Sequence, residues 1–185
     1  ILVGDALLTL AFELMAMMQD QGIKSVNVLK AWNELARAAG SQGMIAGQVI
    51  DLESEHKEVD EETLRYMHKN KTGALFRASL KAGALIFDAN EEHLQALEGF
   101  ADHFGLAFQI TDDILDVEGE ETVTGKPTGS DIRGDKATYV SVYGLSEARR
   151  MAKTSVDLAI KSLGVFGDEA NFLKRVAQNI LERQS

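Results

Sequence analysis

The chain of 185 residues contains a single proline, Pro127, and this scarcity constrains its fold more than any other feature. Proline interrupts helices, so a chain almost without it can stay helical nearly throughout. The good helix formers Ala, Leu, Glu, Lys, Gln and Met are plentiful, and β-branched residues are sparse. An apolar fraction of 45% is enough to bury a sizeable core. The sequence therefore predicts one all-α domain over residues 1–185, folded as a helical bundle.

The charge and the cysteine content exclude several classes of function. The formal net charge is −10, which argues against DNA or RNA as a partner because phosphate backbones bind basic surfaces. An acidic chain can still bind an anionic substrate if metal ions or a few well-placed lysines bridge the charge. There is no cysteine, which excludes disulfides, thiolate metal sites and cysteine nucleophiles. This composition is compatible with a cytoplasmic location, which we expect.

Residues 1–18 are apolar on nearly every face, a pattern that favours a central buried helix. Asp5 and Glu13 interrupt this segment, so no uninterrupted apolar run reaches the roughly 18 to 20 residues that span a bilayer. No transmembrane segment is expected. No Ser, Thr, Asp or Asn precedes Leu2 as a helix cap. We therefore expect that the sequence begins inside an element and that an upstream part is missing.

Helical periodicity continues along the chain, with breaks at glycines. Helices are expected at about residues 26–39, 42–56, 61–87, 90–117, 146–163 and 168–183. The helix at 61–87 is expected to bend near Gly73 or Gly83, and Asn90 is expected to cap the helix that follows it. Gly43 and Gly47 predict a close approach of a neighbouring helix. Residues 118–135, rich in glycine, form the one long loop expected.

The helix at 90–117 carries a cluster of carboxylates on one face. At 100° per residue, Gln109, Asp112, Asp113 and Asp116 fall within roughly 100° of one another. No Lys or Arg lies between Asn90 and Val117, so the like charges are not offset within this helix. Hard oxygen ligands select Mg²⁺ or Ca²⁺, and the geometry favours a metal site. The alternative is a solvated acidic face on a purely structural bundle.

Three lysines are candidates for binding phosphate around this cluster. Lys71 precedes Thr72 and Gly73, whereas Lys126 and Lys136 lie in the long loop and at its end. Taken alone, the pattern around each lysine favours an ordinary surface residue, whereas their grouping around the acidic helix favours phosphate binding. The loop lacks the spacing of a P-loop, and no strand precedes it. The four histidines, His56, His68, His93 and His103, show no metal-ligand spacing and are expected on the surface or in the core.

Taken together, these residues resemble the trans-prenyltransferases, the polyprenyl diphosphate synthase family that includes farnesyl and geranylgeranyl diphosphate synthases. The resemblance implies an isoprenoid-synthase-type helical bundle, with Asp112 to Asp116 as the second of the family's two DDxxD motifs. The first DDxxD motif belongs to an N-terminal half with no counterpart here. The family's Lys-x-Thr-Tyr is usually followed by proline, where this chain has Val140. The matching strings are Gly4-Asp5-Ala6-Leu7-Leu8, Gly47-Gln48 with Asp51-Leu52, Lys71-Thr72-Gly73-Ala74-Leu75, Phe108-Gln109-Ile110-Thr111-Asp112-Asp113-Ile114-Leu115-Asp116, Gly125-Lys126 and Lys136-Ala137-Thr138-Tyr139.

The resemblance also implies a reaction and a set of roles. An allylic diphosphate ionises and condenses with isopentenyl diphosphate in the presence of Mg²⁺, and the product is a short-chain prenyl diphosphate, farnesyl preferred and geranylgeranyl second. Thr72 and Gln109 are implied beside the allylic cation with Lys71 close by, and Gln48 and Asp51 along the cavity. The remaining implied positions are Asp112, Asp113 and Asp116 for Mg²⁺, and Lys71, Lys126 and Lys136 for the diphosphate.

Two classes of function stay open at this point. In the first, the chain is the C-terminal part of a prenyl synthase domain, works as a homodimer, and is inactive as residues 1–185 alone. In the second, it is a non-catalytic helical subunit that binds diphosphate or pairs with a complete prenyl synthase. A degenerate subunit would be expected to lose its aspartates and lysines first. Because all those implied for this half are present, the sequence favours the first class.

Overall fold

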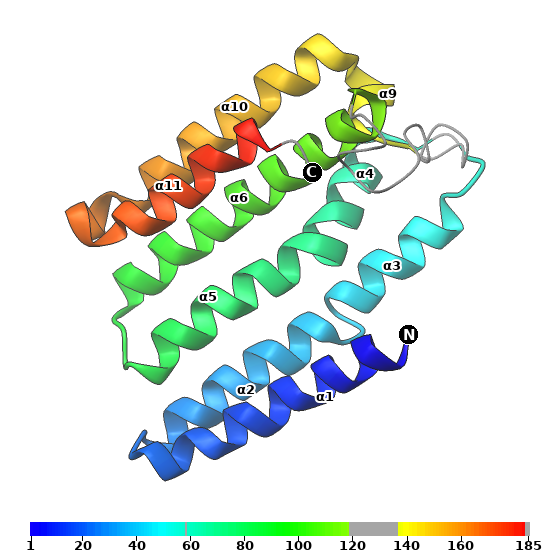
Figure 1. Ribbon diagram of the computed structural model, residues 1–185. Helices are drawn as coiled ribbons and strands as arrows, with labels where there is room; N and C mark the ends of the chain where they lie inside the picture. Colours follow the sequence, from blue (N-terminus) through cyan, green and yellow to red (C-terminus); the bar gives the residue numbers. More distant parts are fainter. Residues whose placement is uncertain (58, 119–136, 184–185) are drawn as a thin grey trace.

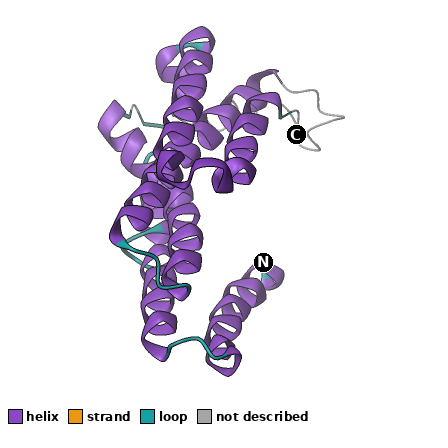
Figure 2. Cartoon of the chain, turned by 90° about the vertical axis from the view of Figure 1, so that its left-hand side faces the viewer, coloured by secondary structure: helices purple, strands orange, loops and turns teal. Residues whose placement is uncertain are grey.

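The computed structural model describes residues 1–57, 59–118 and 137–183, and these form helices joined by short connections without a strand (Figures 1 and 2). The expected all-α bundle is confirmed. Short 3₁₀ turns follow several helices, and a π-helical turn, Lys69–Gly73, joins α4 to α5. The α-helices are α1 (Leu2–Met17), α2 (Ser25–Ala39), α3 (Met44–Glu53), α4 (Glu61–His68), α5 (Ala74–Ile86), α6 (Glu91–Glu118), α9 (Tyr139–Tyr143), α10 (Leu145–Ser162) and α11 (Asn171–Asn179).

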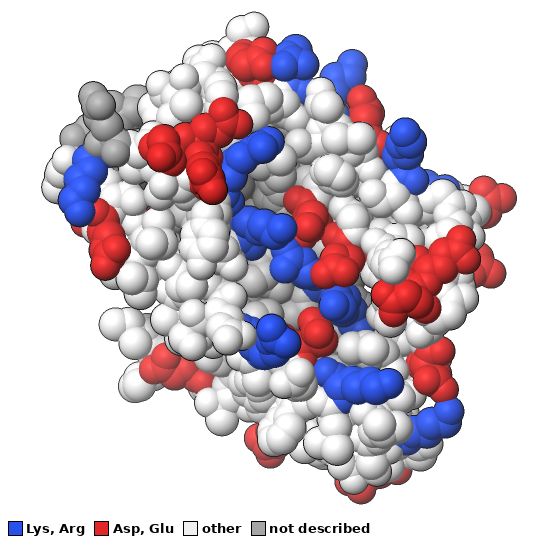
Figure 3. Space-filling model, turned by 180° about the vertical axis from the view of Figure 1, so that it is seen from behind, with Lys and Arg blue, Asp and Glu red and all other residues white. Residues whose placement is uncertain are grey.

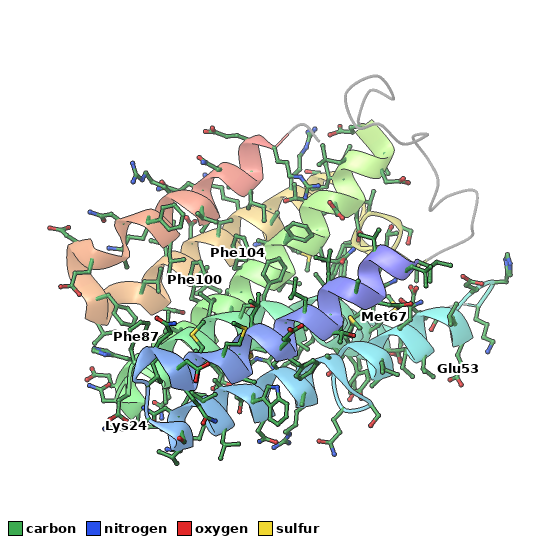
Figure 4. All side chains as sticks on the ribbon, turned by 60° about the horizontal axis from the view of Figure 1, so that its bottom comes forward. Lys24, Glu53, Met67, Phe87, Phe100 and Phe104 are labelled. Atoms are coloured by element: carbon green, nitrogen blue, oxygen red, sulfur yellow. The ribbon has the colours of Figure 1, made fainter. Side chains whose placement is uncertain are left out.

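The long helix α6 lies between α5 on one side and α10 with α11 on the other (Figure 1). Its aromatic face supplies Phe100 and Phe104, which are 2% and 8% exposed (Figure 4). Their rings stack with centroids 5.5 Å apart, and Phe76 of α5 meets Phe104 edge to face. Small residues of α10, among them Ala159, let the two helices approach. This cluster anchors α6 and thereby fixes the face that carries the aspartates.

A second cluster of buried side chains joins α4, α6, α9 and α10. Leu64 and Met67 of α4 pack with Ile110 of α6 and with Tyr139, the first residue of α9. Tyr139 is fully buried although it lies only three residues after the segment 119–136. The cluster therefore brings the start of α9 against the middle of α6, next to the aspartates.

Several expected boundaries are confirmed. The irregular point of the helix predicted at residues 61–87 is the π-helical turn that ends at Gly73. Asn90 accepts a hydrogen bond from the backbone N–H of His93 at 2.8 Å, as a helix cap does. The short helix α9, not expected from periodicity, begins with a reciprocal capping box between Thr138 and Ser141.

The expectation for the first helix is wrong within the described residues. Helix α1 buries none of its residues, and Leu2, Val3 and Leu7 are 81%, 74% and 61% exposed. It packs mainly against α2. The helical stretch Leu2–Gln21 is the one part of the described chain long and apolar enough to cross a membrane. Length and composition alone are weak evidence, because core helices and signal sequences meet the same criteria.

Charged side chains link α2, α5 and α6 on one face of the bundle. Lys81 of α5 lies 3.4 Å from Glu34 of α2 and 3.7 Å from Glu98 of α6. Arg77 of α5 pairs with Asp102 of α6 in the same way. On the face drawn in Figure 3, acidic and basic side chains of the described residues are interleaved. These pairs hold α5 in a fixed position between its neighbours.

Candidate active site

The carboxylates of α6 divide into an open pair and a buried one. Asp112 and Asp116 lie about one helical turn apart and are partly exposed. Asp113 is only 3% exposed. One of its oxygens accepts a hydrogen bond from the amide of Gln109 at 2.9 Å, and the other accepts the backbone N–H of Tyr139 at 2.7 Å. Asp113 is thus engaged inside the protein, and its role as a metal ligand stays a prediction.

Gln109 connects the buried aspartate to the π-helical turn. Its amide oxygen accepts a hydrogen bond from the hydroxyl of Thr72 at 3.1 Å, while its NH₂ group donates to Asp113. These two bonds fix which end of the amide faces each partner. Thr72 and Gln109, which the resemblance places side by side, are therefore in contact across 37 positions of sequence.

The predicted lysine of the π-helical turn is paired with a carboxylate. The Lys71 Nζ lies 2.6 Å from an Asp51 oxygen, and their side chains are 33% and 12% exposed. Gln48, one turn earlier on α3, donates to the same oxygen at 3.4 Å. Gln48, Asp51 and Lys71 thus form one group, and the lining role implied for Gln48 and Asp51 stays a prediction. The partial exposure of Lys71 leaves donors available to a ligand.

Glycines in two helices permit this arrangement. A Cβ added to Gly47 of α3 would lie 2.2 Å from the backbone nitrogen of Lys71, so only glycine lets α3 approach the turn so closely. A Cβ on Gly105 of α6 would lie 3.3 Å from the Cα of Gly73. The close approach predicted at Gly47 is confirmed, and its partner is the turn that carries the lysine. At Gly43 the nearest atoms belong to Ala38, five residues earlier at the end of α2.

A small cavity of about 70 Å³ lies where these groups meet. Its polar lining comes from α3, from α4 with the π-helical turn, from α6, and from the residues before α9. Ala137 and Thr138 close it next to Lys71. The residues that line it are Asp51, Met67, His68, Lys71, Gln109, Asp113, Ala137 and Thr138.

His68 lines this cavity and was not among the predicted site residues. It is 9% exposed, and its ring lies against that of Tyr139 with centroids 5.4 Å apart. Burial, and next the positive charge of Lys71, lower the pKa of His68 to about 4, so the imidazole is neutral at pH 7. Its position three residues before Lys71 was the available signal, because that spacing brings side chains onto one helix face.

Arg183, at the end of the described chain, is a second residue that the sequence reasoning missed. One of its terminal nitrogens lies 3.0 Å from a carboxylate oxygen of Asp112. Its guanidinium also lies over the ring of Phe108, 5.0 Å from the centroid. A cation therefore already sits beside the open carboxylate. No local pattern indicates this contact, since 71 residues separate the two partners.

Two of the predicted substrate-binding residues, Lys126 and Lys136, lie outside the described residues. Among the residues that are described, no group of three or more His, Cys, Asp or Glu side chains is placed to hold a metal ion. The open pair Asp112 and Asp116 nevertheless suits Mg²⁺, which is usually held by one or two carboxylates together with water and substrate phosphate.

Comparison with known proteins agrees with this geometry. The chain is 44% identical over 163 residues to the farnesyl diphosphate synthase of Geobacillus stearothermophilus, an alignment that covers 88% of this chain and 55% of that protein. The fold is similar to that of an FPP/GFPP synthase from Zymomonas mobilis, with a TM-score of 0.81, 38% identity, and coverage of 96% of this chain and 59% of that one.

A geranyltransferase from Helicobacter pylori, solved in complex with magnesium and isoprenyl diphosphate, gives a TM-score of 0.79 at 32% identity, covering 97% of this chain and 58% of that one. The chain thus spans a little over half the length of these relatives. The family model for polyprenyl synthetases matches residues 1–172. The chain belongs to the polyprenyl synthetase family.

Proposed function

We propose that the protein takes part in the condensation of an allylic diphosphate with isopentenyl diphosphate to give a short-chain prenyl diphosphate. One observation carries the proposal. Lys71 of the π-helical turn and Gln109 of α6 line one cavity, and the neighbouring Thr72 donates a hydrogen bond to Gln109. Asp112 and Asp116 lie about one and two helical turns beyond Gln109 on the same helix. Cleavage of an allylic diphosphate requires three kinds of group close together. These are positively charged hydrogen-bond donors, oxygens that bind metal ions, and a fixed polar group at the reacting carbon.

Asp112 and Asp116 are the residues that would hold Mg²⁺, because both are partly exposed on one face of α6. Bound there, the ion supplies electrostatic stabilisation of the negative charge on the departing pyrophosphate. The Helicobacter pylori geranyltransferase in complex with magnesium supports this choice of ion. Asp113 contributes indirectly to the site, because its two hydrogen bonds hold Gln109 and the start of α9 in place.

The protein's own groups account for the remaining steps. Lys71, with Lys126 and Lys136, binds oxygens of the diphosphate, and the allylic carbon–oxygen bond breaks with its electron pair leaving on pyrophosphate. The oxygens of Thr72 and Gln109 face the resulting allylic cation. The alkene of isopentenyl diphosphate attacks this cation, and loss of a proton gives a product longer by one isoprene unit. The remaining apolar faces of the domain would form a separate, water-excluding pocket for the prenyl chain, since water would quench the cation.

Three finer properties belong to the same proposal. We assign farnesyl diphosphate as the preferred product, with geranylgeranyl diphosphate second, in line with the farnesyl diphosphate synthase of Geobacillus stearothermophilus. We place the reaction in the cytoplasm. We also propose that the working form is a homodimer.

An alternative function is a non-catalytic helical subunit that binds diphosphate or pairs with a complete prenyl synthase. Two features favour the catalytic function. The Lys71–Asp51 pair is intact, and so are the hydrogen bonds that join Thr72, Gln109 and Asp113. A non-catalytic subunit would not need to keep either of them.

The test is incorporation of labelled isopentenyl diphosphate with dimethylallyl or geranyl diphosphate in the presence of Mg²⁺. We expect turnover by the intact protein, loss of turnover in Asp112→Ala, and no effect of Asp20→Ala, a control on the turn after α1. Calorimetry with Mg²⁺ and inorganic pyrophosphate separates the alternatives. Binding without turnover favours the non-catalytic subunit, and binding that persists unchanged in Asp112→Ala contradicts both.

A further inference from the structure

His68 is a buried polar side chain whose hydrogen-bonding capacity is not used. It is 9% exposed, and neither Nδ1 nor Nε2 has a hydrogen-bond partner of good geometry among the described residues. A neutral imidazole carries one N–H donor and one acceptor nitrogen. A buried polar group without a partner is costly, so such groups are normally satisfied by protein or by ordered water. The imidazole of His68 therefore needs a hydrogen-bond partner.

The surroundings of His68 provide a place for that partner. One side of the ring packs against Tyr139, with centroids 5.4 Å apart, and this contact fixes the plane of the imidazole. The residue also lines the cavity of about 70 Å³ beside Lys71 and Gln109. Roughly 10 to 15 Å³ of such space is enough for one water molecule, so the cavity has room for ordered water. The lining is polar enough to bind them, because carboxylate, ammonium and amide groups all border the cavity.

We propose that His68 is a positioning residue of the diphosphate site. Its imidazole binds ordered water in the cavity, and this water fixes the ammonium of Lys71 and the amide of Gln109 in the arrangement that receives diphosphate. The inference rests on the proposed function, because it takes Lys71 as a diphosphate-binding residue. It adds a residue from α4 to a site otherwise built from α3, the π-helical turn and α6.

The bonds around the cavity explain why positioning is needed there. Lys71 is held on one side by Asp51 at 2.6 Å, and the amide of Gln109 is held by Thr72 and Asp113. These bonds do not bridge the space between the ammonium and the amide, and the side chain of Gln109 also faces His68. A neutral donor and acceptor at position 68 bridges that space through water and adds no charge that would compete with Lys71 for the substrate.

Two substitutions separate positioning from packing. His68→Phe keeps a ring against Tyr139 and removes both nitrogens, whereas His68→Gln keeps a donor and an acceptor. His103→Phe is the matched control, because His103 of α6 does not line the cavity. The probe is inorganic pyrophosphate with Mg²⁺, followed by calorimetry on the intact protein, and the stability of each variant is followed by urea unfolding.

We expect His68→Phe to weaken binding of Mg²⁺ with pyrophosphate by about tenfold, the effect of one hydrogen bond. The urea midpoint should stay the same or rise, because a buried polar group has been removed. His68→Gln should bind within about threefold of the parent, which is less than 1 kcal/mol. A purely structural role predicts instead that binding and the urea midpoint fall together in His68→Phe.

The failures of the two proposals are distinguishable. If the parent protein binds pyrophosphate and His68→Phe binds it equally well, the positioning role is overturned while the proposed function stands. The positioning role is also overturned if His68→Gln binds pyrophosphate as weakly as His68→Phe does. The hydrogen bonds of the side chain at position 68 would then make no difference to binding. If the parent protein itself binds no pyrophosphate in the presence of Mg²⁺, the proposed function is overturned and the positioning role with it.

Discussion

Helices α1 and α6 show that the apolar content of a helix does not determine its burial. α1 has the more apolar sequence, yet none of its residues is buried among the described parts of the chain. α6 carries a run of acidic residues and buries Phe100, Ala101, Phe104 and Ile110 among others. The difference comes from the number of neighbours. α6 packs against α5, α9 and α10, whereas α1 packs mainly against α2.

The comparison also separates two uses of a helix surface. On α6 the aromatic face packs against α10 and α5, and this leaves the opposite face free to carry Gln109 and the aspartates. A helix that is apolar all round offers no such division. The site is therefore located on the helix whose packing face and polar face are distinct, and the packing face sets the position of the polar one.

The largest effect is expected where α6 is packed most tightly. Phe100 is 2% exposed and stacks on Phe104, so Phe100→Ala removes a buried ring from the centre of the bundle. We expect the free energy of unfolding to fall by about 3–5 kcal/mol, measured by urea denaturation. A loss below about 1 kcal/mol would show that this face of α6 is not the core, and the contrast with α1 would then collapse.

A second prediction separates the buried aspartate of α6 from its open neighbour. Asp113→Ala leaves the backbone N–H of Tyr139 and the amide of Gln109 without their partner. We expect a loss of about 2–4 kcal/mol in the free energy of unfolding, because one buried and one partly buried donor lose their acceptor.

Asp112→Ala is the matched variant for this pair. Asp112 is partly exposed and pairs with the partly exposed Arg183, so we expect a change in stability below about 1 kcal/mol. The binding of Mg²⁺ with pyrophosphate should nevertheless be lost, as calorimetry will show. Equal losses of stability in both variants would contradict the division into an open pair and a buried carboxylate.

The pH dependence of folding provides a third prediction. The pKa of His68 is about 4 in the folded protein against an ordinary value of 6.5, so the unfolded chain takes up a proton first as the pH falls. The stabilising contribution of the neutral His68 side chain is therefore fully present above pH 6.5 and is lost as the pH falls to 4. Over this range the free energy of unfolding should fall by at most about 3 kcal/mol. Urea unfolding of the parent and of His68→Gln over this range measures it. The parent should lose stability relative to His68→Gln as the pH falls from 6.5 to 4, and a constant difference between the two proteins would contradict the shift.

The sequence predicts α6 and its polar face well because the determinants are local. Helical spacing places Gln109, Asp112 and Asp116 on one face, and Asn90 caps the helix as expected. The close approach at Gly47 also follows from a single residue, since a Cβ does not fit there. The irregular turn at Gly73 follows from a glycine within a helical pattern. The family resemblance adds the roles of Lys71 and Thr72, which periodicity alone does not give.

The features that could not be predicted depend on contacts between distant segments. His68 and Tyr139 are 71 positions apart, and so are Asp112 and Arg183, so neither contact leaves a local pattern. The inward orientation of Asp113 depends on the arrival of α9 at α6, although on the helical wheel it belongs with its neighbours. The burial of α1 was predicted from its composition and is wrong within the described chain, because burial requires a partner surface that composition does not specify.

The smallest effect is expected on α1, where a leucine can be compared with a leucine of the core. Leu7 is 61% exposed, whereas Leu64 of α4 is fully buried. Leu7→Ala should change the free energy of unfolding by less than about 0.5 kcal/mol, as is usual at exposed positions, whereas Leu64→Ala should lower it by about 2–5 kcal/mol. A loss above about 1 kcal/mol in Leu7→Ala would mean that the apolar surface of α1 is covered in solution. If that loss grows with protein concentration, the cover is a second copy of the chain, because only association makes stability depend on concentration.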